Sequence, residues 1–208
     1  VDRLFRNLLV DITGNTHRAE FCIDKLYASH GAMGRLGLLE FRGFEMPPHP
    51  RMAAVQALVL RALIALFWER PYTQPLIRFG TSLHDKFMLP HYVEQDFAAV
   101  LHDLSDGLGL QFENEWFQAQ RDFRFPEAGR FTVGDTEVIL QHALEPWPVL
   151  GEDGAVGGTT RFVDSSLERM QVRVTGLQTG QALVCNGIQV PLEWIDENTA
   201  VAGIRFRG

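Results

Sequence analysis

The stretch Arg35-Leu36-Gly37-Leu38-Leu39-Glu40-Phe41-Arg42-Gly43-Phe44-Glu45-Met46-Pro47-Pro48 decides how the first part of the chain folds. It predicts a β-strand that stops at the two prolines, because proline cannot donate a ladder hydrogen bond. Side chains alternate along a strand, so Glu40 and Arg42 point to the same side. A carboxylate and a guanidinium at this spacing indicate one of two things. They form an exposed ion pair at a sheet edge, or a site for a metal ion and a phosphate.

A second strand of mixed charge is expected just upstream, within Asn15–Leu26. Alternation puts Arg18 and Glu20 on one face of it. The small, glycine-containing segment 28–34 separates the two strands and is typical of a turn. If the strands pair antiparallel, Glu20 lies roughly opposite Glu40 or Arg42, and one sheet face carries all four side chains. Carboxylates suit Mg²⁺ and arginines suit phosphate oxygens, so this face favours ATP-dependent chemistry.

Three runs of sequence resemble the amidoligase family that was formerly known only as a domain of unknown function. They are Gly14–Leu26, Gly34–Arg51 and Ala143–Glu152. The order of Glu-x-Arg strand, prolines and long apolar helix is also similar to the last catalytic strand of glutamine synthetase-like ligases. Members of the family are usually longer, often with a transglutaminase-like region ahead of this part. The chain therefore resembles their C-terminal portion.

This resemblance implies a carboxylate–amine ligase that uses ATP and Mg²⁺ and forms an amide through an acyl phosphate. It implies that Glu40 and Glu20 bind the metal, and that Arg42 and Arg18 bind phosphate oxygens. Related ligases bring further carboxylates from earlier strands as a Glu-x-Glu pair. The Glu-x-Glu spacing in this chain, Glu113-Asn114-Glu115, lies downstream in a helical context and does not match that position.

The expected partners follow from the same resemblance. They are the upstream catalytic part of the same protein, and small-molecule or peptide carboxylate and amine substrates. We expect the 208-residue chain to be inactive by itself. The alternative is a non-catalytic module that packs on, or recruits, a partner domain.

Composition excludes several other classes of protein. The chain has 208 residues, 46% hydrophobic content, a mean hydropathy of −0.05 and a net charge of −7 without a basic cluster, so nucleic acid is a poor partner. Cys22 and Cys185 lie far apart and fit a reducing compartment, which predicts a cytoplasmic protein. The longest apolar helix is interrupted by Gln56 and Arg61, which predicts no membrane span.

The pattern along the chain predicts an α+β fold: a short antiparallel sheet backed by helices, followed by a small, sandwich-like all-β module. Helical spacing predicts one helix after Pro50, with an apolar stripe at Met52, Val55, Val59, Ala62 and Leu66, and another helix after Pro90. Short β-like runs begin near residue 122, so we expect a boundary between 1–121 and 122–208. The runs that predict strands are 130–133, 136–140, 169–174, 182–185, 188–192 and 200–206, and Ile188 is expected to face their shared core. Asn186-Gly187 predicts a type I′ hairpin. The glycine-rich segment 151–160 predicts a flexible or substrate-closing loop.

Overall fold

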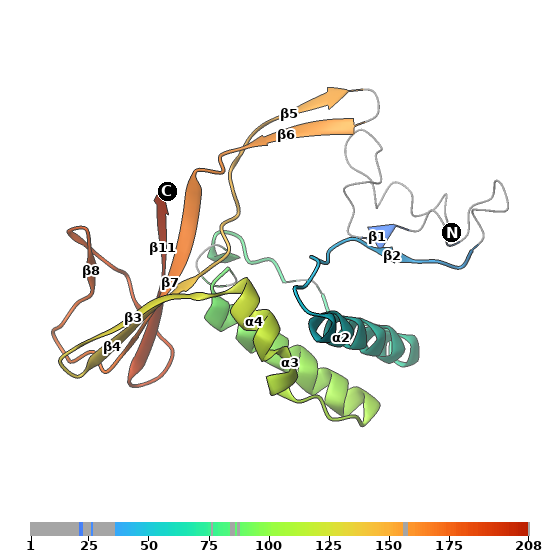
Figure 1. The fold of residues 1–208 in the computed structure, drawn as a ribbon, viewed down its shortest axis with the longest axis horizontal. Helices are drawn as coiled ribbons and strands as arrows, with labels where there is room; N and C mark the ends of the chain where they lie inside the picture. The colour runs from blue at the N-terminus through green and yellow to red at the C-terminus, as the bar shows by residue number, and fades with distance from the viewer. Residues whose placement is uncertain are drawn as a thin grey trace. The chain divides into compact units, whose positions relative to one another are not determined.

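A computed structural model describes residues 21–22, 26, 36–75, 77–83, 86, 88–155 and 158–207 (Figure 1). The chain has an α+β fold and divides into two compact units. One unit takes in residues 1–46 and 147–164, and the other takes in 47–146 and 165–208. These units do not divide the chain at residue 122, where the sequence analysis expects a boundary. Every described helix nevertheless ends before the first strand of the expected all-β module, which begins at Glu127.

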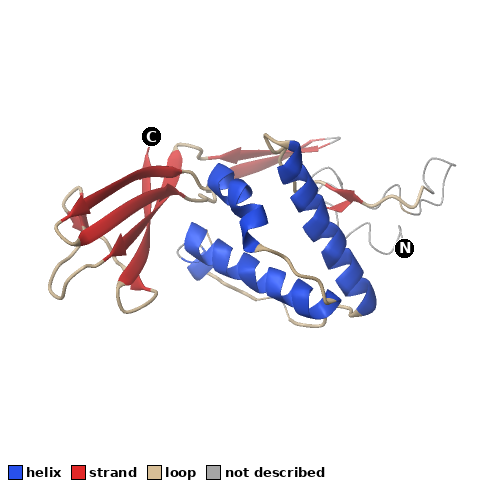
Figure 2. Cartoon of the chain, turned by 60° about the horizontal axis from the view of Figure 1, so that its bottom comes forward, coloured by secondary structure: helices blue, strands red, loops and turns tan. Residues whose placement is uncertain are grey.

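Two long helices form the first core of the larger unit (Figure 2). Helix α2 (Pro50–Glu69) and helix α3 (Pro90–Leu108) both begin with proline, as the sequence predicts, because the first helical position needs no N–H donor. The predicted apolar stripe of α2 faces the core, where it meets α3 and the 3₁₀ turn η5 (Asn114–Phe117). The buried members of this cluster are Ala62, Leu66, Leu101, Leu104 and Phe117. The short helix α4 (Gln118–Arg124) follows η5 directly.

A five-stranded antiparallel sheet forms the second part of the larger unit, in the order β10-β11-β7-β4-β3. Its strands are β3 (Glu127–Val133), β4 (Thr136–His142), β7 (Leu167–Thr175), β10 (Glu193–Trp194) and β11 (Thr199–Arg207). The sequence predicts all of them except β10, which is only two residues long.

One face of this sheet is apolar and covered. Val138, Val172 and Val174 are buried in it, and Leu177, Leu183 and Leu192 from the following segment pack against them. That segment contains the hairpin of β8 (Val184–Cys185) and β9 (Ile188–Gln189), whose turn residues Asn186 and Gly187 both have positive φ. The type I′ hairpin is thus confirmed, and the covered sheet gives the module its sandwich-like character. The expectation that Ile188 joins this core is wrong: it lies at the hairpin tip and is 73% exposed.

The opposite face of the sheet is polar and holds the start of α3. Gln171, which is fully buried, accepts a hydrogen bond from the His91 backbone N–H at 2.9 Å and donates one to Gln141 at 3.3 Å. Burial and the positive charge of Arg173 lower the pKa of His91. The Tyr92 hydroxyl is buried beside Glu193, and burial, followed by that carboxylate, raises the pKa of Tyr92 to about 12.

The segment expected to be a glycine-rich loop is a β-hairpin instead. Strand β5 (Val149–Ala155) pairs antiparallel with β6 (Gly158–Val163), and Glu152 forms an ion pair with its cross-strand partner Arg161. The sequence predicts a loop because glycine has a low strand propensity. That prediction is wrong because strand formation also depends on pairing with the partner strand. The smaller unit also contains the short sheet of β1 (Phe21–Cys22) and β2 (Glu40–Phe41).

Helix α2 is the one described helix that is long and apolar enough to cross a membrane, judged by length and composition alone. Core helices of soluble proteins pass the same test. Gln56, in the first half of α2, donates a hydrogen bond to Gln120 of α4 at 3.0 Å, and Ala62 and Leu66 contribute to the core.

Gly176, directly after β7, gives a test of the sheet's geometry. Its φ is +81°, and a Cβ atom there would lie 2.6 Å from the backbone oxygen of Asp135. Gly180 has a similar φ of +85° with open space around it. An L-residue in this backbone region costs about 1–2 kcal/mol, so Gly180→Ala should cost that much. Gly176→Ala should cost roughly 3 kcal/mol, since rigid backbone must also move. Urea unfolding of both variants checks this, and equal losses would contradict it.

Candidate functional site

The candidate site is built on the short sheet of the smaller unit. Strand β1 pairs antiparallel with β2, as the sequence predicts, with Phe21 opposite Phe41 and Cys22 opposite Glu40. Because directly opposed residues point to the same face, Cys22 and Glu40 share one side of the sheet. Cys22 is buried, whereas the Glu40 side chain is 45% exposed. The strand ends at Phe41, so it is shorter than the sequence predicts, and Arg42 lies directly after it rather than within it.

Glu40 and Arg42 are joined by a two-point ion pair. Arg42 Nε donates to Glu40 Oε1 at 3.0 Å, and Arg42 Nη2 donates to Glu40 Oε2 at 3.2 Å. The predicted same-side arrangement of these two side chains is therefore present. The parallel geometry orients the planar guanidinium more firmly than a single contact would. Since the Arg42 side chain is 22% exposed, the pair is accessible to solvent at the surface of the described residues.

The other two predicted site residues, Arg18 and Glu20, lie outside the described residues. Within the described part of the chain, no group of three or more His, Cys, Asp or Glu side chains gathers as a metal site. Mg²⁺ takes oxygen ligands in an octahedral arrangement, of which carboxylates usually supply one or two. The described residues place Glu40 as a candidate ligand, but it is engaged with Arg42, so they do not by themselves fit a bound metal ion.

Chemically, this arrangement is a guanidinium group that a neighbouring carboxylate holds in a fixed orientation. A guanidinium in this state can bind an anionic oxygen by exchange with Glu40. The same geometry is found in exposed ion pairs that have a purely structural role, and those contribute little to stability. Geometry alone therefore leaves both the ligand-binding and the structural interpretation open.

Comparison with known protein families decides the family. The family described as "Putative amidoligase enzyme (DUF2126)" matches residues 1–208. The chain belongs to this family. The resemblance seen in the sequence is thus confirmed over the whole length. No curated protein and no solved structure matches the chain.

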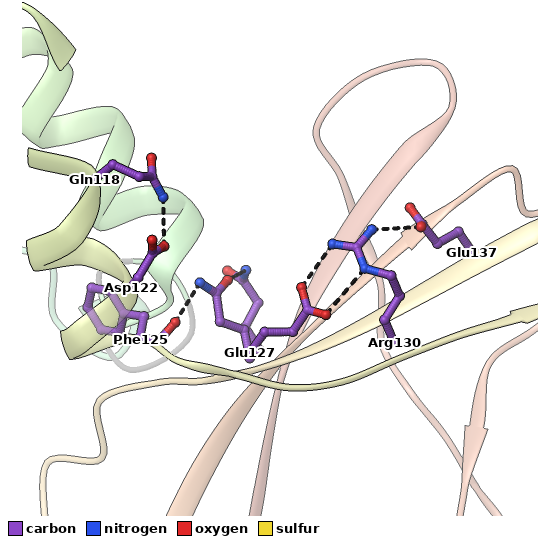
Figure 3. A network of polar contacts seen from close by, with 8 residues as sticks. Gln118, Asp122, Phe125, Glu127, Arg130 and Glu137 are labelled. Carbon is purple, nitrogen blue, oxygen red and sulfur yellow. Dashed lines mark hydrogen bonds and ion pairs between the residues drawn. The ribbon is translucent and has the colours of Figure 1, made fainter. Parts of the chain in front are cut away.

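A second Glu–Arg arrangement on the surface of the large sheet has a simpler explanation (Figure 3). Arg130 on β3 forms ion pairs with Glu127 at 2.9 Å and with Glu137 on the neighbouring β4 at 2.7 Å. The hydrogen bond from Arg130 lowers the pKa of Glu127, and the two carboxylates raise the pKa of Arg130. All three side chains are solvent-exposed, and the arrangement pairs adjacent strands. We assign it a structural role.

The polar face of the same sheet also carries a buried ion pair that the sequence does not predict. Arg169 Nε donates to Glu145 Oε2 at 2.8 Å, and the two side chains are only 6% and 3% exposed. Arg205 lies 3.9 Å from the other Glu145 oxygen. Glu145 belongs to one of the family-like runs, but no local pattern shows that it is buried. The alternation of Arg169, Gln171 and Arg173 along β7 predicts a polar face, and such a face is more often exposed to solvent.

This pair is expected to support the fold. Glu145→Ala leaves a buried guanidinium without its main counter-charge, which costs about 3–5 kcal/mol. Glu137→Ala is the matched control, because it removes a carboxylate from an exposed pair and should change stability little. Chemical unfolding followed by circular dichroism measures both. Equal unfolding midpoints for the two variants would contradict a structural role for Glu145.

Proposed function

We propose that this chain is the C-terminal part of an ATP-dependent carboxylate–amine ligase. The observation that carries the proposal is that the amidoligase family matches the whole chain. Within that match, the Glu40–Arg42 pair lies at the end of strand β2, in the family-like run Gly34–Arg51. The accessibility of that pair supports a ligand-binding role over a covered structural one. ATP and Mg²⁺ enter as part of the proposal.

In the proposed reaction, a carboxylate oxygen of the substrate attacks the γ-phosphorus of ATP, and ADP leaves. The amine nitrogen of the second substrate then attacks the acyl carbon, inorganic phosphate leaves, and the nitrogen loses a proton to give the amide. Both steps move negative charge across phosphoryl oxygens. Fixed positive charge at those oxygens lowers the barrier.

The proposed roles of the residues follow from their charges. Arg42 binds phosphate oxygens, and Arg18 is proposed as a second phosphate-binding arginine. Glu40 orients Arg42 through the two-point contact and, together with Glu20, is proposed to bind the metal when further carboxylates complete its ligand set. These further carboxylates are proposed to come from an upstream catalytic part of the same protein.

The remaining parts of the proposal concern substrates and location. The carboxylate and the amine belong to small molecules or peptides. We place the protein in the cytoplasm, where ATP is available and where the described cysteines, Cys22 and Cys185, stay unpaired.

The first prediction from this proposal concerns Arg42 in the enzyme that contains this chain. Arg42→Ala should lower kcat about 10²–10³-fold, because it removes a charge aimed at the transferring phosphoryl group. Arg130→Ala is the matched control, since it also breaks a Glu–Arg contact on an exposed strand. ATP-dependent release of phosphate in the presence of both substrates is the readout. An Arg42→Ala enzyme with normal turnover and normal folding would support the alternative, a non-catalytic packing module.

The second prediction concerns the 208-residue chain by itself. Its described residues gather no carboxylate cluster, so we expect no ATP-dependent phosphate release from the purified chain. Adding the upstream part of the protein, as a separate polypeptide or fused to the chain, should bring activity. Steady phosphate release by the isolated chain would show that the proposed division of the site is wrong.

A further inference from the structure

Helix α2 has two apolar faces, and within the described part of the larger unit only one of them is covered. Its inner face packs on α3 and η5 through the core. Its outer face, which we define by exposed side chains on the opposite side of the helix, includes Leu58 and Ile64, which are 40% and 46% exposed, and Trp68, which is 87% exposed. The full outer face is Ala54, Ala57, Leu58, Arg61, Ile64, Ala65, Trp68 and Glu69.

Such a surface is unusual for a helix face that no described residue of its own unit covers. A surface helix of a globular protein normally carries polar residues opposite its core stripe. A contiguous exposed apolar patch rimmed by charges is typical of an interaction site. The outer face also borders a groove of about 610 Å³ between α2 and the end of α3, which is lined by Arg61, Ile64, Ala65, Trp68, Glu69, Gly107 and Leu108.

Two opposite charges on this face have no partner among the described residues. Arg61 and Glu69 both line the groove, and neither makes an ion pair or a side-chain hydrogen bond with any residue that the structure describes. They lie eight positions apart, with Ala65 midway between them. Eight residues are a little over two helical turns, so the two charges stand on the same face of the helix, too far apart to pair with each other.

We propose that the outer face of α2 binds the outer face of α2 in a second copy of this chain. In an antiparallel pair with a two-fold axis at Ala65, Arg61 of each copy faces Glu69 of the other, so two identical ion pairs form. The small Ala65 side chains at the axis allow the two helices to approach closely. Each Trp68 indole then lies near the opposite Arg61, where its face attracts the guanidinium.

Symmetry favours this occupant over others. A surface that binds itself must be complementary under a two-fold rotation, and a cation and an anion placed equally far from a small central residue meet that condition. A lipid surface would cover Leu58, Ile64 and Trp68 but would leave Glu69 against a membrane that is commonly anionic. A single pair of helices is at the small end of interface sizes, so we expect a dissociation constant on the order of micromolar.

Sedimentation velocity of the 208-residue chain, at concentrations spanning the micromolar range, tests the proposal. The wild-type chain should change from monomer to dimer as its concentration rises. Arg61→Glu and Glu69→Arg should each weaken the dimer about tenfold or more, because each puts two like-charge contacts into the interface. The double variant, with both substitutions, should restore the wild-type dissociation constant. Raised salt should weaken the wild-type dimer.

Two control variants separate the interface from general effects of charge and aromatic loss. Glu115→Arg makes the same charge change as Glu69→Arg at an exposed position on η5, and it should leave the dimer unchanged. Trp194→Ala removes an exposed indole from β10 and should leave the dimer unchanged, whereas Trp68→Ala removes one from the proposed interface and should weaken the dimer. All substituted positions are exposed, so circular dichroism should show native spectra throughout.

Three results would overturn the proposal. They are a wild-type chain that stays monomeric at all concentrations, a dimer that does not respond to Arg61→Glu, and single-variant losses that the double variant fails to reverse. A monomeric chain that sediments with phospholipid vesicles, and loses that binding with Trp68→Ala, would assign the outer face to lipid instead. None of these results depends on whether the chain takes part in ligase chemistry.

Discussion

The larger unit depends on a buried hydrogen bond between the large sheet and the first turn of α3. Gln171 in the central strand β7 accepts a hydrogen bond from the backbone of His91, and the Glu145–Arg169 pair lies on the same face. Buried polar groups are costly unless they are satisfied, so the contact between Gln171 and His91 restricts where α3 can begin. Since α2 packs on α3, the same contact helps to fix α2 with respect to the sheet. The apolar face of the sheet contributes burial but is less selective in position.

Local signals explain which parts of this architecture can be predicted from the sequence. Pro50 and Pro90 mark helix starts, the spacing of Val55, Val59 and Leu66 identifies the inner face of α2, and Asn186-Gly187 specifies a hairpin turn. Each of these depends on neighbouring residues only. The hairpin of β5 and β6 was not predicted, because its glycines are typical of a loop and its pairing depends on both strands together. The burial of Glu145 was missed for a similar reason: its partner Arg169 is 24 residues away.

The candidate site shows the same division between local and distant information. The spacing of Glu40 and Arg42 on a strand is sufficient to predict that their side chains meet, and they do. It is not sufficient to predict what the pair binds, because a metal ligand, a phosphate-binding arginine and a surface ion pair share this spacing. The proposed ligase function, which rests on membership of the amidoligase family, would use the pair in the first two ways. The decisive distinction lies in groups that surround the pair, and these come from elsewhere in the sequence.

Helix α2 shows why composition cannot assign a helix to core, membrane or interface. By length and apolar content it passes the test for a membrane span, yet Met52, Ala62 and Leu66 face a protein core. Its outer face differs from a lipid-facing surface in one respect: Arg61 and Glu69 stand at matched distances from Ala65. A bilayer does not stabilise such spacing. A two-fold contact between two copies does, because each charge then forms an ion pair with the opposite charge of the other copy. The arrangement of two charges therefore carries information about this helix that its mean hydropathy does not.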